Sequence, residues 1–313
     1  MPLGLRRGTV TAVLEELDEL VRLEVDDVPC VAYPRLTGSV AVGDDVLVNE
    51  QARLLGLGSG GFDVLYANLT RGLELPVEEG AHVLKLPYTP GQVALRHAEE
   101  TDELATSLQG LPVVLCTLHS QVAPVCAALA GVRVAYVQVA GGALPVSFSD
   151  SVRALKARGL VEVAIAVAPC LDGDIECVTA AAALAWSKAR GVDAVVCGVG
   201  PGIVGTGSRV GHGALALADT ANAASALGGR PVLAVRMSGA DPRERHRGVS
   251  HHSRAVLDLC LGVVEVPDAA EGDGWREACT GLPLAHMGRG PDEDPDFFRA
   301  AFAAGVVARG LVG

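Results

Sequence analysis

From residue 111 onwards the chain repeats one pattern: a short apolar run, a polar loop, and a helical stretch that ends in glycine. The continuous apolar runs are typical of parallel strands that are covered on both faces. The predicted strands are 113–117, 132–139, 161–168, 194–198, 232–237 and 263–266. The predicted helices are 121–130, 150–158, 175–190, 214–227, 251–261 and 296–309. Alternating strands and helices with glycine at the helix ends predict βαβ units, and hence a Rossmann-like parallel α/β sandwich domain.

The first part of the chain has a different pattern. Val21, Leu23 and Val25 alternate with Arg22 and Glu24, as in a half-buried strand. Short strands of this kind are predicted at 8–14, 20–25, 29–33 and 62–68, and a further strand follows the Gly-Asp turn in 42–47. Strands with frequent turns favour a small all-β barrel or sandwich. We therefore expect a barrel-like module at 1–88, a junction at 89–110 within or after the proline-rich stretch 76–90, and the α/β domain at 111–313.

Hydrophobic residues make up 50% of the chain, and the mean hydropathy is +0.35. A membrane span would need about 20 consecutive apolar residues. The most apolar stretches, 113–131 and 134–148, are interrupted by His, Gln, Pro and Gly, so no span is predicted. Residues 1–9 lack the apolar core of a signal peptide, and the eight cysteines form no CxxC pair. These features predict a cytoplasmic protein with reduced thiols.

The formal net charge is −12, and only 4% of residues are aromatic. Nucleic-acid surfaces need clustered Lys and Arg, and single-strand binders use aromatic stacking, so a nucleic-acid partner is not expected. The expected partner is a small molecule, without nucleic acid or membrane. A homo-oligomer remains an open alternative.

The predicted topology locates a candidate site, because ligands of open α/β sheets bind outside the carboxyl ends of the strands. The loops at that edge are richer in Gly, His, Arg, Ser and Asp than those at the opposite edge. They are 118–120, 140–145, 169–174, 199–211 and 238–250. The acidic cluster of Asp172, Asp174 and Glu176 is expected at a helix start, where carboxylates cap free N–H groups.

Two of these loops are rich in glycine, which lets a backbone approach an anion closely and offer its N–H groups. The glycine-loop candidates are Gly141, Gly142, Gly200, Gly202, Gly205, Thr206 and Gly207. Gly200-x-Gly202-x-x-Gly205 matches the dinucleotide fingerprint as a string, but it follows the fourth strand of the domain rather than the first. No G-K-[ST] exists, which excludes a P-loop. The loop therefore serves either a tight crossover or an anionic or polar ligand.

The segment 236–254 carries five arginines and three histidines but only two acids, in an otherwise acidic chain. Arg236, Arg245 and Arg247 are candidates to hold carboxylate or phosphate, because guanidinium groups bind such anions bidentately. The candidates for proton transfer are His119, Asp241, His246 and His251. A solvated loop with surface ion pairs is the alternative. Ser250 is a candidate N-cap that places His251 and His252 in a first helical turn.

No zinc-ligand spacing appears in the chain, so the prediction is no metal site. His251 and His252 are the alternative ligands, although neighbouring helical side chains point about 100° apart. The sequence leaves the cofactor unknown.

Several stretches resemble the bacterial family called domain of unknown function 3866. They are YPRLTGSVAVGDDVLVN, LGLGSGGFDVLYANL, LPYTPGQ, LHSQVAP, GGALPVSFSD, GVGPGIVGTGS and DPRERHRGVSHHS. The resemblance spans nearly the whole chain and implies a shared two-domain build. It implies no activity and no catalytic residue.

The sequence therefore predicts a pocket for a small anionic metabolite, for example a phosphorylated one, at the carboxyl edge of a parallel sheet. A hydrolase or transferase would use it for catalysis. A ligand-sensing or regulatory module, or an oligomeric scaffold, would not. Whether the protein is an enzyme stays open at this point.

Overall fold

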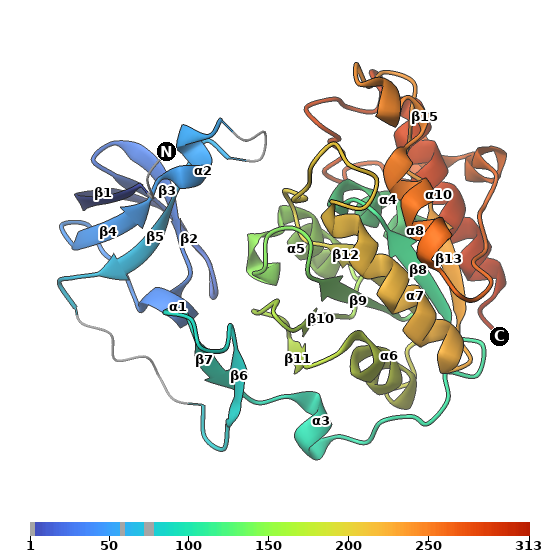
Figure 1. Ribbon diagram of the computed structural model, residues 1–313, viewed down its shortest axis with the longest axis horizontal. Coiled ribbons are helices and arrows are strands. Elements are labelled where there is room, and N and C mark those ends of the chain that lie inside the picture. Colours follow the sequence, from blue (N-terminus) through green and yellow to red (C-terminus); the bar gives the residue numbers. More distant parts are fainter. Residues whose placement is uncertain (1–3, 57–59, 72–77) are drawn as a thin grey trace. The chain divides into compact units, whose positions relative to one another are not determined.

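The computed structural model describes residues 4–56, 60–71 and 78–313 (Figure 1). The chain divides into two compact units, Met1–Arg96 and His97–Gly313. The boundary falls inside the stretch 89–110 that the sequence predicts as a junction. Residues 76 and 77 of the proline-rich stretch lie outside the described residues.

The N-terminal unit contains a closed five-stranded barrel with the order β1-β2-β3-β5-β4. Its strands are β1 Leu5–Glu16, β2 Val21–Val25, β3 Val28–Ala32, β4 Asp45–Asn49 and β5 Asp63–Asn68. Neighbouring strands are antiparallel except β3 and β5, which is the Greek-key arrangement of OB-type barrels. Asp26 and Asp27 both have positive φ and connect β2 to β3 in a tight hairpin. The predicted barrel is confirmed.

Alternation of apolar and charged residues along β2 explains how the barrel forms a hydrophobic core. Val21, Leu23 and Val25 are buried in the barrel core, whereas Arg22 and Glu24 are partly exposed. The barrel also carries the short helices α1 Pro34–Thr37 and α2 Gln51–Leu54, and the unit ends in a hairpin of β6 Val83–Lys85 and β7 Val93–Leu95.

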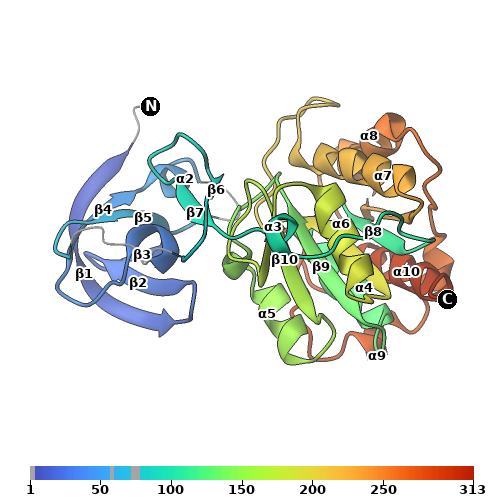
Figure 2. The same cartoon turned by 90° about the horizontal axis from the view of Figure 1, so that it is seen from below.

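The C-terminal unit contains a six-stranded parallel sheet with the order β11-β10-β9-β12-β8-β13. Figure 2 labels β8, β9 and β10 of this sheet. The strands are β8 Pro112–Cys116, β9 Val134–Val139, β10 Val163–Val167, β11 Ile175–Cys177, β12 Ala194–Val199 and β13 Arg230–Ala234. The central strands β8, β9 and β12 are buried along their whole length. Both faces of the sheet are therefore covered, as the continuous apolar runs predict.

Helices cover the two faces of the sheet in separate groups. One face packs against α4 Val122–Ala128, α5 Asp150–Ala157 and α10 Pro295–Gly310. The other face packs against α6 Ala180–Ala189, α7 Ala216–Ala226 and α8 His251–Leu259. Short helices α3 Ala98–Thr101 and α9 Trp275–Ala278 complete the unit. No helix in the described ranges is long and apolar enough to span a membrane.

The structure corrects two predicted elements. The helix expected at 175–190 begins only at Ala180, where the Thr179 side chain accepts a hydrogen bond from the Ala182 N–H, and 175–177 is strand β11. The acidic cluster therefore precedes and enters a strand, so its placement at a helix start is wrong. The expected strand 263–266 is also wrong: Glu265 forms one isolated bridge with Val232 of β13.

Candidate functional site

The crevice where topology favours a ligand is filled by backbone. After β9 the chain enters α5 on one face of the sheet, and after β12 it enters α7 on the other face. The gap between the carboxyl ends of these two neighbouring strands is therefore the topological switch point. A Cβ on Gly142 would lie 2.1 Å from the Gly200 carbonyl oxygen, and one on Gly141 would lie 2.5 Å from the Gly213 oxygen. The Ala143 N–H also donates to the carbonyl of Pro201 at 2.7 Å. These glycines allow two loops to pack against each other.

His119 lies beside this packed crevice. Its Nδ1 is 3.1 Å from the Val199 carbonyl oxygen, and its Nε2 is 2.6 Å from Oγ of Ser149, the N-cap of α5. Burial lowers the pKa of His119 to about 4, so the ring is neutral. The structure thus places His119 in a bridge between the loop after β8 and the start of α5.

The distal half of the glycine loop folds back on itself. Gly205 and His212 form an antiparallel bridge, and the Thr206 N–H donates to the Gly211 carbonyl at 2.7 Å. This turn leaves Gly207 exposed and holds His212 buried at its base. Gly202 has a φ of +68°, where glycine is favoured.

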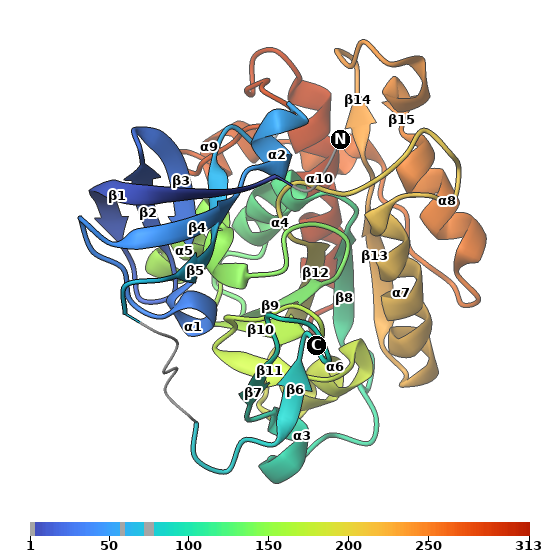
Figure 3. The same cartoon turned by 60° about the vertical axis from the view of Figure 1, so that its left-hand side comes forward.

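The Arg/His segment is closed by a two-stranded ribbon and leads into α8. Strands β14 Met237–Ser238 and β15 Gly248–Val249 pair with each other beyond β13 (Figure 3). The Ser250 side chain accepts from the His252 N–H at 3.2 Å. His251 and His252 therefore occupy the first turn of α8.

A buried ion-pair network supports this segment. Both oxygens of Asp241 accept hydrogen bonds from Arg243, at 2.9 and 2.8 Å, and Oδ2 lies 3.4 Å from Arg236 and 3.5 Å from Arg289. Burial alone would raise the pKa of Asp241, but the hydrogen bonds from Arg243 hold it well below its usual range. Burial lowers the pKa of Arg236 to about 10, which leaves this side chain charged at neutral pH. Asp241 is thus a paired structural carboxylate in this network.

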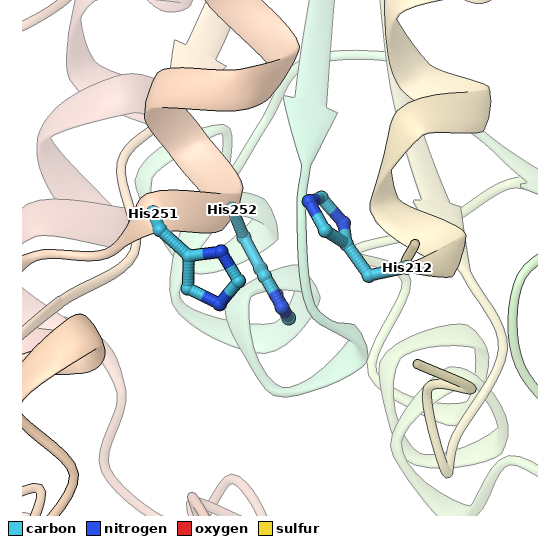
Figure 4. Close-up of side chains that lie close together, drawn as sticks. All are labelled: His212, His251 and His252. Atoms are coloured by element: carbon cyan, nitrogen blue, oxygen red, sulfur yellow. The ribbon is translucent and has the colours of Figure 1, made fainter. Parts of the chain in front are cut away.

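Four imidazoles lie in mutual contact beside this network. His212 stacks on His252 with ring centroids 4.0 Å apart, and His251 lies 4.5 Å from His252 and 4.8 Å from His246. Figure 4 shows His251 and His252 on α8 with His212 across from them. Burial, together with neighbouring cationic groups, lowers the pKa of His246 to about 3 and of His252 to about 2, and also lowers the pKa of His212 and His251. All four rings are therefore neutral at physiological pH.

The hydrogen bonds of these rings define their free nitrogens. His212 Nε2 lies 3.1 Å from the Arg209 carbonyl oxygen, to which it donates, and its Nδ1 is buried with no hydrogen-bond partner. Nε2 of His251 is also buried without a hydrogen-bond partner. Nδ1 of His252 lies 3.2 Å from Nη1 of Arg236, and Nδ1 of His246 lies 2.8 Å from Oγ of Ser250.

A pocket of about 340 Å³ opens next to the four histidines. Its lining residues are Gly207, Arg209, Arg245, His251, Arg254, Ala255 and Asp258. Arg209 pairs with Asp258 at 2.8 Å, whereas Arg245 and Arg254 form no ion pair within the part of the chain that the structure describes. The glycine loop and the Arg/His segment thus share one pocket.

The structure brings together only part of the predicted site. Gly207, Arg245 and His251 line the pocket, while Arg236, Asp241, His246 and His252 lie buried behind it. The remaining predicted residues do not line it. They are His119, Gly141, Gly142, Gly200, Gly202, Gly205, Thr206 and the exposed Arg247. Sequence reasoning missed Arg209 and His212, whose one signal was their position at the end of the glycine loop.

The family to which the chain belongs follows from a comparison of its sequence. The model for "Protein of unknown function (DUF3866)" matches residues 29–278, a stretch that contains the glycine loop and the whole Arg/His segment. No curated protein matches the chain. Because the match covers most of the chain and both segments that line the pocket, the protein belongs to the DUF3866 family.

Proposed function

We propose that the C-terminal unit binds a small anionic ligand, a phosphate or carboxylate compound, in the pocket between the glycine loop and α8. The observation that supports this proposal is that three arginines, Arg209, Arg245 and Arg254, line one cavity. Its volume of about 340 Å³ lies in the range of small-molecule sites.

The chemistry of the lining favours an anion over a neutral ligand. Arg245 and Arg254 are exposed, and neither pairs with an acid among the described residues, so both guanidinium groups are available to form forked hydrogen bonds with a phosphate or carboxylate. Asp258 offsets the charge of Arg209 only. The pocket therefore has a positive charge in a chain whose net charge is −12.

Catalysis by hydrolysis or group transfer would depend on His251. His251 is the imidazole among the lining side chains, and its pKa is lowered, so its neutral form is available as a base. Asp241 is held by Arg243 and His246 contacts Ser250, so neither is a candidate partner for the ligand. Binding without turnover would make the protein a ligand sensor.

We also propose a cytoplasmic location and no nucleic-acid partner. All eight cysteines are free, which suits a reducing compartment. On the barrel, Arg6, Arg7, Arg22, Arg35, Arg53 and Arg71 each pair with an acid. Paired arginines do not form the basic surface that nucleic-acid backbones require.

The first prediction is that inorganic phosphate or a phosphorylated metabolite stabilises the protein through Arg245 and Arg254. A thermal-shift panel of phosphate, sugar phosphates, nucleotides and dicarboxylates should yield a ligand that raises the Tm of the wild type. The double variant Arg245→Ala/Arg254→Ala should lose this shift, because both unpaired guanidinium groups are removed. Calorimetric titration of the best ligand then measures the loss in affinity.

Arg247→Ala is the comparison that locates the site. Arg247 belongs to the same segment and carries the same charge, but its side chain does not line the pocket. We expect it to weaken binding far less than Arg245→Ala. Equal losses in the two variants would show a diffuse charge effect, and no stabilising anion in the panel would refute the proposal.

A further inference from the structure

We propose that His212, His251 and His252 form a binding site for a divalent transition-metal ion of the zinc class. This inference goes beyond anion binding and does not depend on it. Because His251 also lines the pocket, a metal held here would lie close to that cavity.

Two segments far apart in the sequence supply the three rings. His212 ends the glycine loop, and His251 and His252 form the first turn of α8 (Figure 4). Each residue offers one ring nitrogen, and these nitrogens all lie within 4.8 Å of one another. Imidazole nitrogen is a preferred ligand of zinc and of its neighbours in the first transition row.

The free nitrogens of His212 and His251 are independent evidence for a bound group. Nε2 of His212 donates to the Arg209 carbonyl, so its buried Nδ1 carries a lone pair and has no hydrogen-bond partner. A second ring nitrogen that donates to a backbone carbonyl is the usual arrangement of a metal-binding histidine. Nε2 of His251 is likewise buried and without a hydrogen-bond partner. A buried polar atom without a partner is unfavourable, and coordination to a metal ion would satisfy such a nitrogen.

His252 must move for the site to close. In the structure its ring stacks on His212 at an angle of 20°, and Nη1 of Arg236 donates to its Nδ1. Tetrahedral zinc with Zn–N distances of about 2.0–2.1 Å needs nitrogens about 3.3 Å apart. His252 would therefore turn out of the stack and release Arg236, which keeps Asp241 as its partner. His212 and His251 are the principal ligands, and His252 completes the set.

The test is a titration of the chelator-treated protein with Zn²⁺ alone, followed by calorimetry and by metal analysis after dialysis. We expect one ion per chain. His212→Ala and His251→Ala should each weaken binding by more than about tenfold, the effect that loss of even an outer partner has on metal affinity. His252→Ala should weaken it less. His82→Ala, which removes an exposed imidazole from the N-terminal unit, is the control and should bind as the wild type does.

Co²⁺ gives a second readout, because its visible absorption distinguishes tetrahedral nitrogen coordination from a hydrated surface ion. The wild type should show the tetrahedral spectrum, and circular dichroism identifies any variant that fails to fold. If His251→Ala fails to fold, His251→Gln is measured in its place, because residue 251 is partly exposed. No saturable Zn²⁺ binding in the wild type, or wild-type affinity in His212→Ala and His251→Ala, would overturn the proposal. Arg245→Ala/Arg254→Ala should retain Zn²⁺, which separates this test from that of the anion site.

Discussion

At the scale of single residues, the buried charges and imidazoles of the C-terminal unit differ in whether their polar atoms have partners. Asp241 has several arginine partners, whereas His212 and His251 each keep a free ring nitrogen. Removal of one member of a buried ion pair destabilises proteins by about 3–5 kcal/mol. Loss of function in an Asp241 variant would therefore report on folding as well as on any chemistry. The free imidazole nitrogens are better markers of a ligand site.

The neutral histidines predict how stability depends on pH. In the folded state the pKa is about 4 for His119, about 3 for His246 and His286, and about 2 for His252, in each case chiefly through burial. The unfolded chain titrates near 6.5. Below that pH the unfolded state binds more protons than the folded state, so the free energy of unfolding falls as the pH drops from about 6.5 toward 4. Each such histidine contributes a slope of at most about 1.4 kcal/mol per pH unit.

Urea unfolding followed by tryptophan fluorescence measures this slope, because Trp186 and Trp275, the two tryptophans of the chain, both lie in the C-terminal unit. We expect the midpoint to be constant between pH 7 and 8 and to fall steadily below 6.5. His246→Gln should reduce the slope. A midpoint that does not change between pH 7 and 5 would contradict the assignment of buried neutral rings.

At the scale of elements, the two glycine loops at the switch point show a structural use of glycine that a sequence motif does not reveal. The position of Gly142 leaves no room for a side chain, since its Cβ would lie 2.1 Å from the Gly200 carbonyl oxygen. Gly142→Ala should therefore separate the loops and lower the free energy of unfolding by about 1–3 kcal/mol. Gly207→Ala is the matched control, because nothing lies within 4 Å of its added Cβ. Equal stability of the two variants would show that the crevice is not packed.

The elements that the sequence predicts correctly are those with long, regular patterns. The predicted apolar runs 132–139 and 194–198 identify the buried strands β9 and β12 because both faces of the sheet are covered. Strand β11 was missed because three residues before an alanine-rich helix resemble the start of that helix. Ser250 was recognised as an N-cap because capping is local chemistry. His212 was not identified as a partner of His251, since only tertiary packing brings the two segments together.

At the scale of the whole molecule, the two units differ in how their arginines are paired with acids. The barrel neutralises its own arginines in surface ion pairs, while the α/β unit leaves Arg245 and Arg254 unpaired among the described residues. The family match covers residues 29–278 and so includes parts of both units.

The two proposals together predict coupling between metal and anion. A divalent ion at His212 and His251 would add positive charge next to Arg245, so an anion in the pocket should bind more tightly when the metal is present. Thermodynamic linkage then requires the anion to tighten metal binding by the same factor, for which about fivefold or more is typical of coupled sites. Methylphosphonate with micromolar Zn²⁺ avoids precipitation of metal phosphate. Calorimetric titrations of each ligand with and without the other measure the two factors.

Variants decide whether this coupling arises in the pocket. Arg245→Ala/Arg254→Ala should abolish it while leaving Zn²⁺ affinity in the absence of anion intact, because only the anion loses contacts. His212→Ala should also abolish the coupling, because this variant loses a metal ligand. If both ligands bind the wild type but neither changes the affinity of the other, the metal and the anion occupy separate places. The pocket would then hold the anion without the three histidines taking part, as expected for a sensor rather than a metal-dependent hydrolase.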